Sequence, residues 1–184
     1  INFKIDYKII PFRGEYYNLT SSASYLVKNL IYPVPNPDFP FLGVHFTRRI
    51  NNSIESGPNA VFAFSREGYK MSIINLKELF ESISYIGFLK LIKLYWKEGI
   101  NEMYRSCSKQ AYLRSLQKLI PEIKISDISS GGAGVRAQAV KSNGEMVDDF
   151  LIISKNNIIN VCNAPSPAAT ASFAIGEHIT NLIK

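Results

Sequence analysis

The stretch YKIIPFRGEYYNL, residues 7–19, predicts a β-strand and with it the fold class of the chain. Its β-branched and aromatic residues and its alternation are typical of strands. Similar segments occupy residues 25–32, 43–50 and 54–63, separated by the turn-like TSSAS and the proline-rich PVPNPDFPF. Prolines end strands and stiffen loops. Short strands joined by short connections pair antiparallel, so we expect a mostly antiparallel sheet.

The hydrophobic period changes at Asn75. From there to Ile120, apolar residues recur three and four positions apart, which predicts two or three helices ending before Pro121. Strands resume at IKISDI, GVRAQAV, DDFLIIS and NIINVCN, and the turn SNGE links the second to the third. The expected architecture is α+β: a mostly antiparallel sheet with a helical insertion at about residues 75–120 packed on one side.

A helix with an unusual start is expected near the end of the chain, in NAPSPAATASFAIGEHI. Ser166 is a candidate N-cap, and Pro167 suits a first helical turn, so the helix is predicted from Ala168 onward. No acidic residue occupies that first turn, although the helix dipole favours one there. Two interpretations stay open: close packing of small residues against a sheet, or approach of an anion or an electron-rich ring.

Composition places the chain among ordinary globular proteins. Its 184 residues are 46% hydrophobic and carry a formal net charge of +6, with the cations scattered along the sequence, so we expect no nucleic-acid partner. The spacing of Cys107 and Cys162 indicates neither a metal site nor a disulfide, which favours reduced thiols. We find no stretch typical of a membrane span or signal peptide. A start at Ile1, within an apparent strand, suggests a piece of a longer polypeptide.

Two residues are the main candidates for chemistry. Arg136 follows a glycine cluster at the predicted start of a strand, where its planar fork could meet a carboxylate. The alternative is a surface arginine at a strand end. His45 lies among apolar residues on a predicted strand and could accept a proton near neutral pH. A half-buried structural histidine is the alternative, and His178 is expected to face solvent.

Weaker candidates lie on loops and strand ends. Arg13 and Tyr16 belong to a strand with a flexible point between them, and Arg66 follows the predicted bend GPN. The cluster GGAG is not a dinucleotide fingerprint, because it lacks the required glycine spacing between a strand and a helix.

Several long strings together resemble the second half of the L-2-hydroxyglutarate oxidase and dehydrogenase family, from residue 9 to 183. This family belongs to the FAD-dependent group that includes D-amino-acid oxidase, glycine oxidase and sarcosine oxidase. The strings are IIPFRGEYY, LIYPVPNPDFPFLGVHFTRRI, GPNAVFAFSREGY, EMYRSCSKQAYLRSLQKLIPEI, GAGVRAQAV, DDFLI and NAPSPAATASFAIG. LGVHFTR and NAPSPAAT are far more specific than any single glycine motif.

The resemblance implies the oxidation of L-2-hydroxyglutarate to 2-oxoglutarate with FAD as the hydride acceptor. It implies that Arg136 pairs with the substrate carboxylate, that His45 is the best candidate proton acceptor, and that Arg13, Tyr16 and Arg66 line the site or hold the second carboxylate. The flavin ring would contact a loop and helix start made of Asn163, Ala164, Pro165, Ser166, Pro167, Ala168, Ala169 and Thr170. The helix N-terminus there would stabilise negative charge on the reduced flavin.

The resemblance also divides the chain into a substrate-binding domain at residues 1–153 and a strand and helix at 154–184 that return to the FAD domain. The glycine-rich FAD unit of the family is absent from this chain, so the missing half would come from the same parent chain or from a second chain. A non-catalytic remnant, or an amino-acid or amine oxidase, are the alternatives. We expect a cytoplasmic location, with peripheral association with the inner face of a membrane left open.

Overall fold

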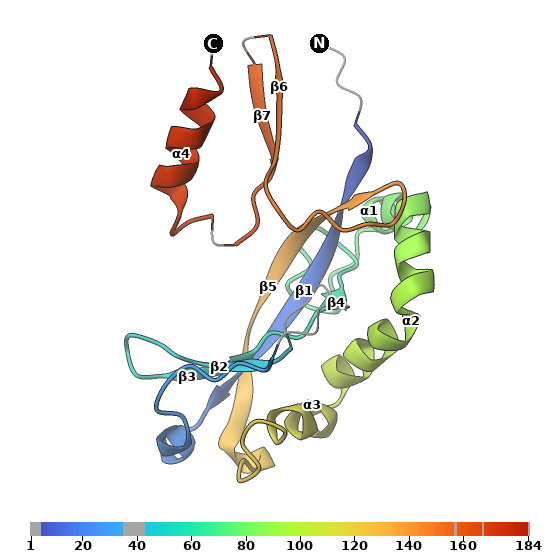
Figure 1. Ribbon diagram of the computed structural model, residues 1–184. Coiled ribbons are helices and arrows are strands. Elements are labelled where there is room, and N and C mark those ends of the chain that lie inside the picture. Colours follow the sequence, from blue (N-terminus) through green and yellow to red (C-terminus); the bar gives the residue numbers. More distant parts are fainter. Residues whose placement is uncertain (1–4, 35–42, 157, 167, 184) are drawn as a thin grey trace.

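A long antiparallel ladder of two strands organises the molecule (Figure 1). The structure is a computed structural model, and it describes residues 5–34, 43–156, 158–166 and 168–183. Strand β1 (Tyr7–Leu19) pairs with β5 (Ile128–Lys141) along its whole length, with one register shift between Glu15 and Tyr17. The strand predicted at residues 7–19 is confirmed, and β3, β4 and β5 all pair with it.

Three short strands complete the sheet on the other side of β1. They are β2 (His45–Arg48), β3 (Ile54–Gly57) and β4 (Val61–Phe62), and their pairings are antiparallel, as expected. The single strand expected at residues 54–63 is divided, because Gly57 has a φ of 138°, which favours glycine and turns the chain. The bend predicted at GPN is therefore confirmed. The proline-rich loop lies largely outside the described residues.

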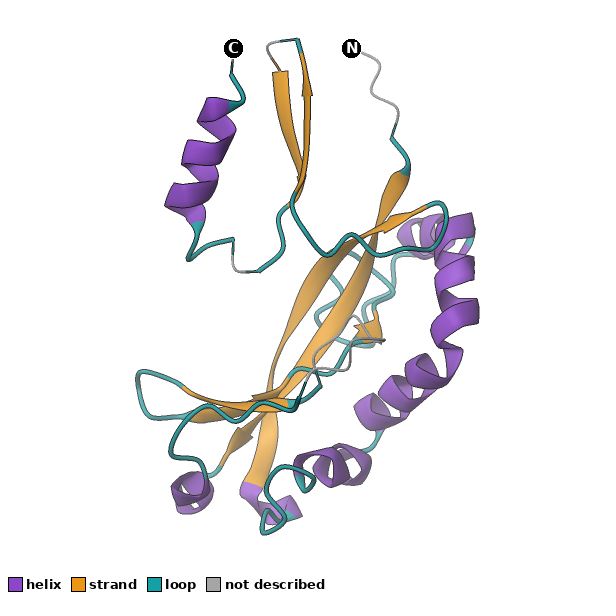
Figure 2. Ribbon diagram, in the orientation of Figure 1, coloured by secondary structure: helices purple, strands orange, loops and turns teal. Residues whose placement is uncertain are grey.

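Helices α1 (Leu76–Ile83), α2 (Ile86–Cys107) and α3 (Lys109–Leu116) cover one side of the sheet (Figure 2). Asn75 caps α1 by accepting from the backbone N–H groups of Lys77 and Glu78, and Ser108 caps α3 by accepting from that of Ala111. The helical insertion and the α+β class are confirmed. No helix among the described residues is long and apolar enough to cross a bilayer.

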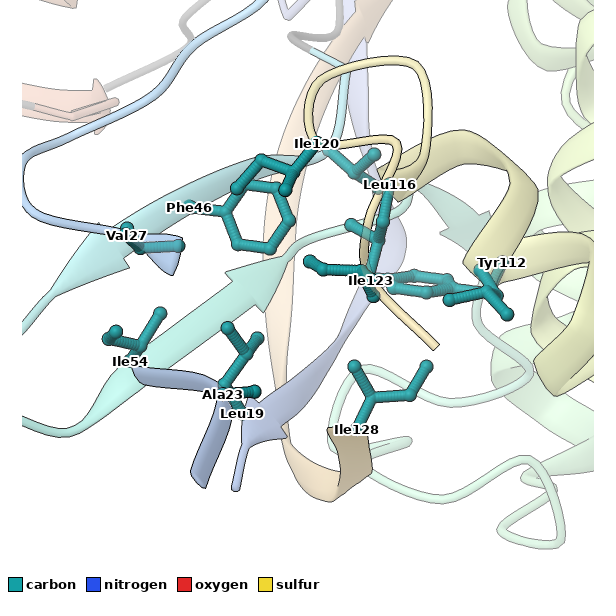
Figure 3. Packing of buried hydrophobic residues seen from close by; sticks show 12 residues of the cluster. Leu19, Ala23, Val27, Phe46, Ile54, Tyr112, Leu116, Ile120, Ile123 and Ile128 are labelled. Atoms are coloured by element: carbon teal, nitrogen blue, oxygen red, sulfur yellow. The ribbon is translucent and has the colours of Figure 1, made fainter. Parts of the chain in front are cut away.

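Two apolar clusters hold the helices against the sheet. The larger one joins strands β1, β2 and β3 to α3 and the segment after it, and includes Phe46, Ile54, Tyr112, Leu116 and Ile123 (Figure 3). The smaller one joins β1 and β5 to α2 through Ile10, Phe12, Phe88, Leu91, Val140 and Met146. In these clusters, apolar side chains from one face of the strands pack against apolar side chains that are spaced three and four residues apart on the helices.

The strands expected at residues 25–32 and 123–128 are wrong. A 3₁₀ helix, η1 (Ser21–Leu26), covers only the start of the first, whose remaining residues form an isolated bridge between Ile31 and Phe46 and no strand, and η2 (Ile125–Asp127) occupies the middle of the second. The guanidinium of Arg48 donates to the carbonyls of Ser24 and Val27, so a distant strand residue satisfies the carbonyls of this turn. In η2 the hydrogen bond is local, because the carboxylate of Asp127 accepts from the backbone N–H of Lys124.

The C-terminal segment forms a hairpin and a helix at the end of the ladder that carries Tyr7 and Lys141 (Figure 1). Strands β6 (Leu151–Lys155) and β7 (Ile158–Asn163) pair with each other, and α4 spans Ser172–Asn181. The domain division after residue 153 falls inside β6. The helix start predicted at Ala168 is wrong, because the Ala168 N–H donates to the Pro165 carbonyl in a turn that includes Ser166, and α4 begins only at Ser172. Pro167 lies outside the described residues.

The first turn of α2 approaches the end of β5 closely at Gly87. A Cβ atom at this position would lie 2.1 Å from the carbonyl oxygen of Lys141. We expect Gly87→Ala to lower the free energy of unfolding by about 1–3 kcal/mol, because α2 or β5 must shift. Gly99→Ala is the matched control on the same helix. Its Cβ meets nothing within 4 Å, so alanine should stabilise the helix by roughly 1 kcal/mol. Urea unfolding of both variants measures the difference, and equal destabilisation would contradict the close approach.

Candidate functional site

A cavity of about 550 Å³ lies where β5 meets the end of β7, and we call it the Arg136 cavity. Its described lining comes from β1, β5, the segment before β6, the end of β7 and the chain that follows it: Ile9, Arg136, Ala137, Gln138, Asp148, Cys162, Asn163, Ala164, Pro165 and Ser166. The fold therefore brings Arg136 together with the first four residues of the predicted flavin-contacting segment. These residues are more than 25 positions away from Arg136 in the sequence.

Two buried amides fix the geometry of this cavity. The Asn163 Nδ2 atom donates to the carbonyls of Val147 and Asp149, at 3.2 and 2.8 Å. The Gln138 Nε2 atom donates to the same Val147 carbonyl at 2.9 Å. Because both side chains are more than nine-tenths buried, these hydrogen bonds are shielded from water and hold the end of β7 beside β5.

Arg136 contributes a partly desolvated guanidinium to the wall of this cavity. The glycine cluster had predicted that Arg136 lies at the start of a strand. The strand β5 begins earlier, at Ile128, so Arg136 lies in its middle. Burial lowers the pKa of the Arg136 guanidinium, and the nearby Asp148 carboxylate opposes that shift. An arginine remains charged at neutral pH after such a shift. The cavity can therefore receive a carboxylate on a planar, donor-rich group.

The segment after Asn163 has the chemistry that a flavin edge requires. Ala164, Ser166, Ala169 and Thr170 are exposed, and their small side chains leave the backbone accessible. Helix α4 follows with no acidic residue in its first turn and no side chain capping it, so its electropositive end carries no built-in anion. These residues fit the FAD that the resemblance implies, although α4 begins at Ser172 and not at Ala168.

Several residues of the Arg136 cavity were not identified from the sequence. Gln138 follows Arg136 by two positions on the same strand, so alternation could have indicated it. No sequence pattern around Asp148 or Cys162 predicts that they line this cavity. Only the pairing of β6 with β7 and the Asn163 hydrogen bonds bring them to β5. A hydrogen bond with the Cys162 thiol and burial raise the pKa of Tyr7 to about 12.

His45 lies on the opposite edge of the sheet from Arg136. Strand β3 separates β2 from β1, and β5 pairs with the other side of β1. His45 does not line the Arg136 cavity. Its ring stacks on Tyr32 with centroids 4.3 Å apart, and its Nδ1 atom lies 3.2 Å from the Gly43 carbonyl oxygen. The described residues of this chain therefore do not bring the two main candidates into one cavity. The expected exposure of His178 is confirmed.

The environment of His45 predicts a pH effect on stability. Partial burial lowers the pKa of the imidazole below its ordinary value of 6.5, which outweighs the opposite effects of Gly43 and Glu55. The unfolded chain then binds more protons, so stability should fall as the pH drops below about 6.5 and through the lower folded pKa. We expect His45→Gln to remove this part of the acid sensitivity, measured by urea unfolding between neutral and acidic pH. A pH dependence identical to that of the wild type would contradict it.

The other predicted substrate ligands are engaged elsewhere in the structure. Arg13 is only 1% exposed, and its Nε atom lies 3.0 Å from the Glu15 carboxylate, so it forms an internal ion pair. Arg66 pairs with Glu81 across the surface at 2.9 Å. Tyr16 lines a separate cavity of about 450 Å³ with Glu15, Tyr17 and Tyr69 among its walls. The fold thus gathers none of these three residues around Arg136.

No group of three or more histidine, cysteine, aspartate or glutamate side chains among the described residues is arranged to hold a metal ion. Cys107 and Cys162 are both free thiols.

Comparison with known proteins gives one family and a consistent set of relatives. Residues 2–182 match the family model described as FAD dependent oxidoreductase. The chain is 58% identical over 172 residues to an L-2-hydroxyglutarate dehydrogenase of Indibacter alkaliphilus, covering 94% of this chain and 43% of that protein. It is 52% identical over 181 residues to the mitochondrial L-2-hydroxyglutarate dehydrogenase of Caenorhabditis elegans, covering 96% and 42%. The chain therefore spans about two fifths of the length of the curated relatives that it matches.

Proposed function

The chain belongs to the family of FAD-dependent oxidoreductases, and we propose that it forms the substrate-binding portion of an enzyme that oxidises L-2-hydroxyglutarate to 2-oxoglutarate. The observation that carries the proposal is the Arg136 cavity, in which the guanidinium of the exposed residue Arg136 lies beside the small-residue segment that follows Asn163. A carboxylate held at Arg136 would lie next to the flavin edge held by that segment. The division into a substrate domain and a returning strand and helix stays part of this proposal.

The residues of this chain would perform three tasks in the reaction. Arg136 would bind one carboxylate of the substrate and orient the hydroxyl-bearing carbon. The backbone of residues 163–170 and the start of α4 would contact the flavin and stabilise negative charge on it. FAD, when bound, accepts the hydride from that carbon, and the hydroxyl proton must pass to a base as the ketone forms.

We propose His45 as that base on the strength of the resemblance, and the role requires the complete enzyme to bring the substrate hydroxyl within reach of β2, on the edge of the sheet opposite Arg136. The lowered pKa of His45 keeps the imidazole neutral at pH 7, which is the form that accepts a proton. We expect His45→Gln in the complete enzyme to lower kcat by roughly 100-fold and to remove one limb of the pH–rate profile. Steady-state kinetics across the pH range measure both. Full turnover with an unchanged pH profile would remove His45 from the mechanism.

The polypeptide that completes the FAD site is the proposed partner of the C-terminal segment. Phe173 on α4 is 94% exposed, and Val161 on β7 and Ile183 after α4 are also exposed. Large apolar side chains at such exposure are typical of surfaces that pack against another part of a domain. We propose that the missing FAD-binding portion covers them, in the same parent chain or from a second one. A cytoplasmic location and peripheral membrane association stay predictions.

The test is anaerobic reduction of the complete protein with its flavin bound. The reduction is measured as the loss of the visible absorption of oxidised FAD. We expect L-2-hydroxyglutarate to bleach the flavin, and D-2-hydroxyglutarate and L-glutamate to leave it oxidised. Bleaching by L-glutamate would favour an amino-acid oxidase. A protein that binds FAD and is reduced by none of the three would favour a non-catalytic remnant.

A further inference from the structure

We propose that a second, apolar cavity between α2 and the sheet binds an uncharged aromatic compound carrying a hydroxyl group, of the phenol class. This cavity has a volume of about 410 Å³, and we call it the α2 cavity. The proposal does not depend on the redox function, because no described residue lines both the α2 cavity and the Arg136 cavity.

The walls of the α2 cavity are almost entirely apolar and largely aromatic. One wall is a helical stripe on α2, and the other comes from β1, β4 and the turn after β5. Described lining residues are Phe12, Ala60, Phe62, Phe88, Leu91, Ile92, Tyr95, Trp96, Gly99, Ile100, Glu102, Met103 and Met146. The Phe62 and Phe88 rings lie 4.7 Å apart between centroids. Aromatic walls and methionine sulfur atoms favour a flat ring as the ligand.

The cavity exists because α2 does not close over the sheet. The stripe Phe88, Leu91, Tyr95, Gly99 and Glu102 has the three- and four-residue spacing of a core-facing surface. Tyr95 has non-helical backbone angles, which bend α2 midway along the sheet (Figure 1). Four residues later the stripe reaches Gly99, where an added Cβ would meet nothing within 4 Å. The bend and the missing side chain together leave the space unfilled.

Glu102 supplies the cavity's carboxylate. The residue is 7% exposed, its Oε2 atom accepts from the Ala60 backbone N–H at 3.2 Å, and its Oε1 atom pairs with Arg105. Each carboxylate oxygen has a further lone pair, so Glu102 can accept one more hydrogen bond from a ligand hydroxyl. An anionic ligand would meet this carboxylate in an apolar surrounding, which is unfavourable. Burial also raises the pKa of Glu102.

The volume sets the size of the ligand. An apolar cavity of about 150 Å³ accommodates benzene, so the α2 cavity has room for a ring system larger than one benzene ring. A two-ring phenol combines the required flatness, neutrality and single donor. 1-Naphthol and 1-naphthoate form a matched pair of probes, because they share the rings and differ in the charge of the substituent at neutral pH.

The experiment is isothermal titration of the complete protein with each probe. We expect saturable binding of 1-naphthol and at least tenfold weaker binding of 1-naphthoate. Gly99→Phe, which places a ring at the open position, should weaken 1-naphthol at least tenfold. Leu89→Phe is the control, since Leu89 lies on α2 but does not line this cavity, and it should bind as the wild type does. Glu102→Gln should reduce the discrimination between the two probes.

Three outcomes would overturn the proposal: no binding of 1-naphthol, equal binding of both probes, or unchanged binding in Gly99→Phe. The first outcome would mean that the rest of the polypeptide or a partner fills the cavity. Met103→Trp fills the same space from a different position and replaces Gly99→Phe if that variant does not fold, as judged by circular dichroism. Anaerobic flavin reduction by L-2-hydroxyglutarate is also measured for each variant. This second measurement distinguishes a failure of probe binding at the α2 cavity from a failure of the proposed oxidation.

Discussion

Replacing Arg136 by alanine is expected to lower kcat/KM for L-2-hydroxyglutarate by roughly 100-fold in the complete enzyme. Removing one partner of a desolvated charge pair costs about 2–5 kcal/mol, and each 1.4 kcal/mol is tenfold. Arg136 is an exposed residue whose guanidinium is only partly desolvated, which supports a value near the lower end of that range. The loss should fall mainly on KM if Arg136 acts in substrate binding, and it should extend to kcat if the carboxylate also sets the hydride geometry.

Arg136→Lys tests the geometry as well as the charge. A lysine keeps the cation and loses the planar fork, so an intermediate loss of activity is expected. Arg66→Ala is the matched control, because it removes an exposed arginine whose ion pair with Glu81 lies outside the Arg136 cavity. Steady-state kinetics of the three variants are the measurement. Wild-type kinetics in Arg136→Ala would remove the Arg136 cavity from the proposed function.

Replacing Tyr112 by alanine is expected to lower the free energy of unfolding by about 3–5 kcal/mol. Tyr112 is fully buried in the larger apolar cluster (Figure 3). Its ring lies 4.5 Å from that of Tyr17 between centroids. Its hydroxyl donates to the Ser56 carbonyl at 3.1 Å. The substitution would leave a cavity between α3 and the sheet and an unsatisfied carbonyl on β3.

Tyr112→Phe separates the ring from the hydroxyl. It keeps the packing and removes one buried hydrogen bond, so a loss of about 1–2 kcal/mol is expected. Urea unfolding followed by far-UV circular dichroism gives both values. A loss below about 1 kcal/mol in Tyr112→Ala would show that α3 does not pack on the sheet as the structure has it.

Local patterns were sufficient for most of the regular elements. The strand at residues 7–19 and the helices within residues 75–120 carry strong alternation or a clear helical period, and both are present. The segments at residues 25–32 and 123–128 have β-rich composition, but the first begins in η1 and contributes only an isolated bridge at Ile31, and the second contains η2. Arg48, more than 20 residues away in sequence, donates to the carbonyls of η1, and no local propensity contains that contact.

The start of α4 was also not predicted correctly from local residue types. Ser166 and Pro167 are good start signals by residue type, yet the Ala168 N–H donates to the Pro165 carbonyl and the helix begins at Ser172. The composition of the segment was still informative, because small residues and a missing acid are found where the flavin-contacting backbone is proposed. Residue type did not give the backbone path of the segment, which leaves β7 at Asn163, a residue held by hydrogen bonds to the Val147 and Asp149 carbonyls.

The sequence by itself determined the α+β class, the antiparallel pairing, the helical insertion and the family, because each depends on short-range periodicity or on long matching strings. Only the tertiary structure decided that Arg136 shares a cavity with Asn163 and Ser166, that Arg13 is buried in an ion pair, and that His45 lies on the opposite edge of the sheet. The physical reason is register. Phe12 pairs with Arg136 across more than 120 residues, and a shift of one residue would send every side chain of β5 to the other face.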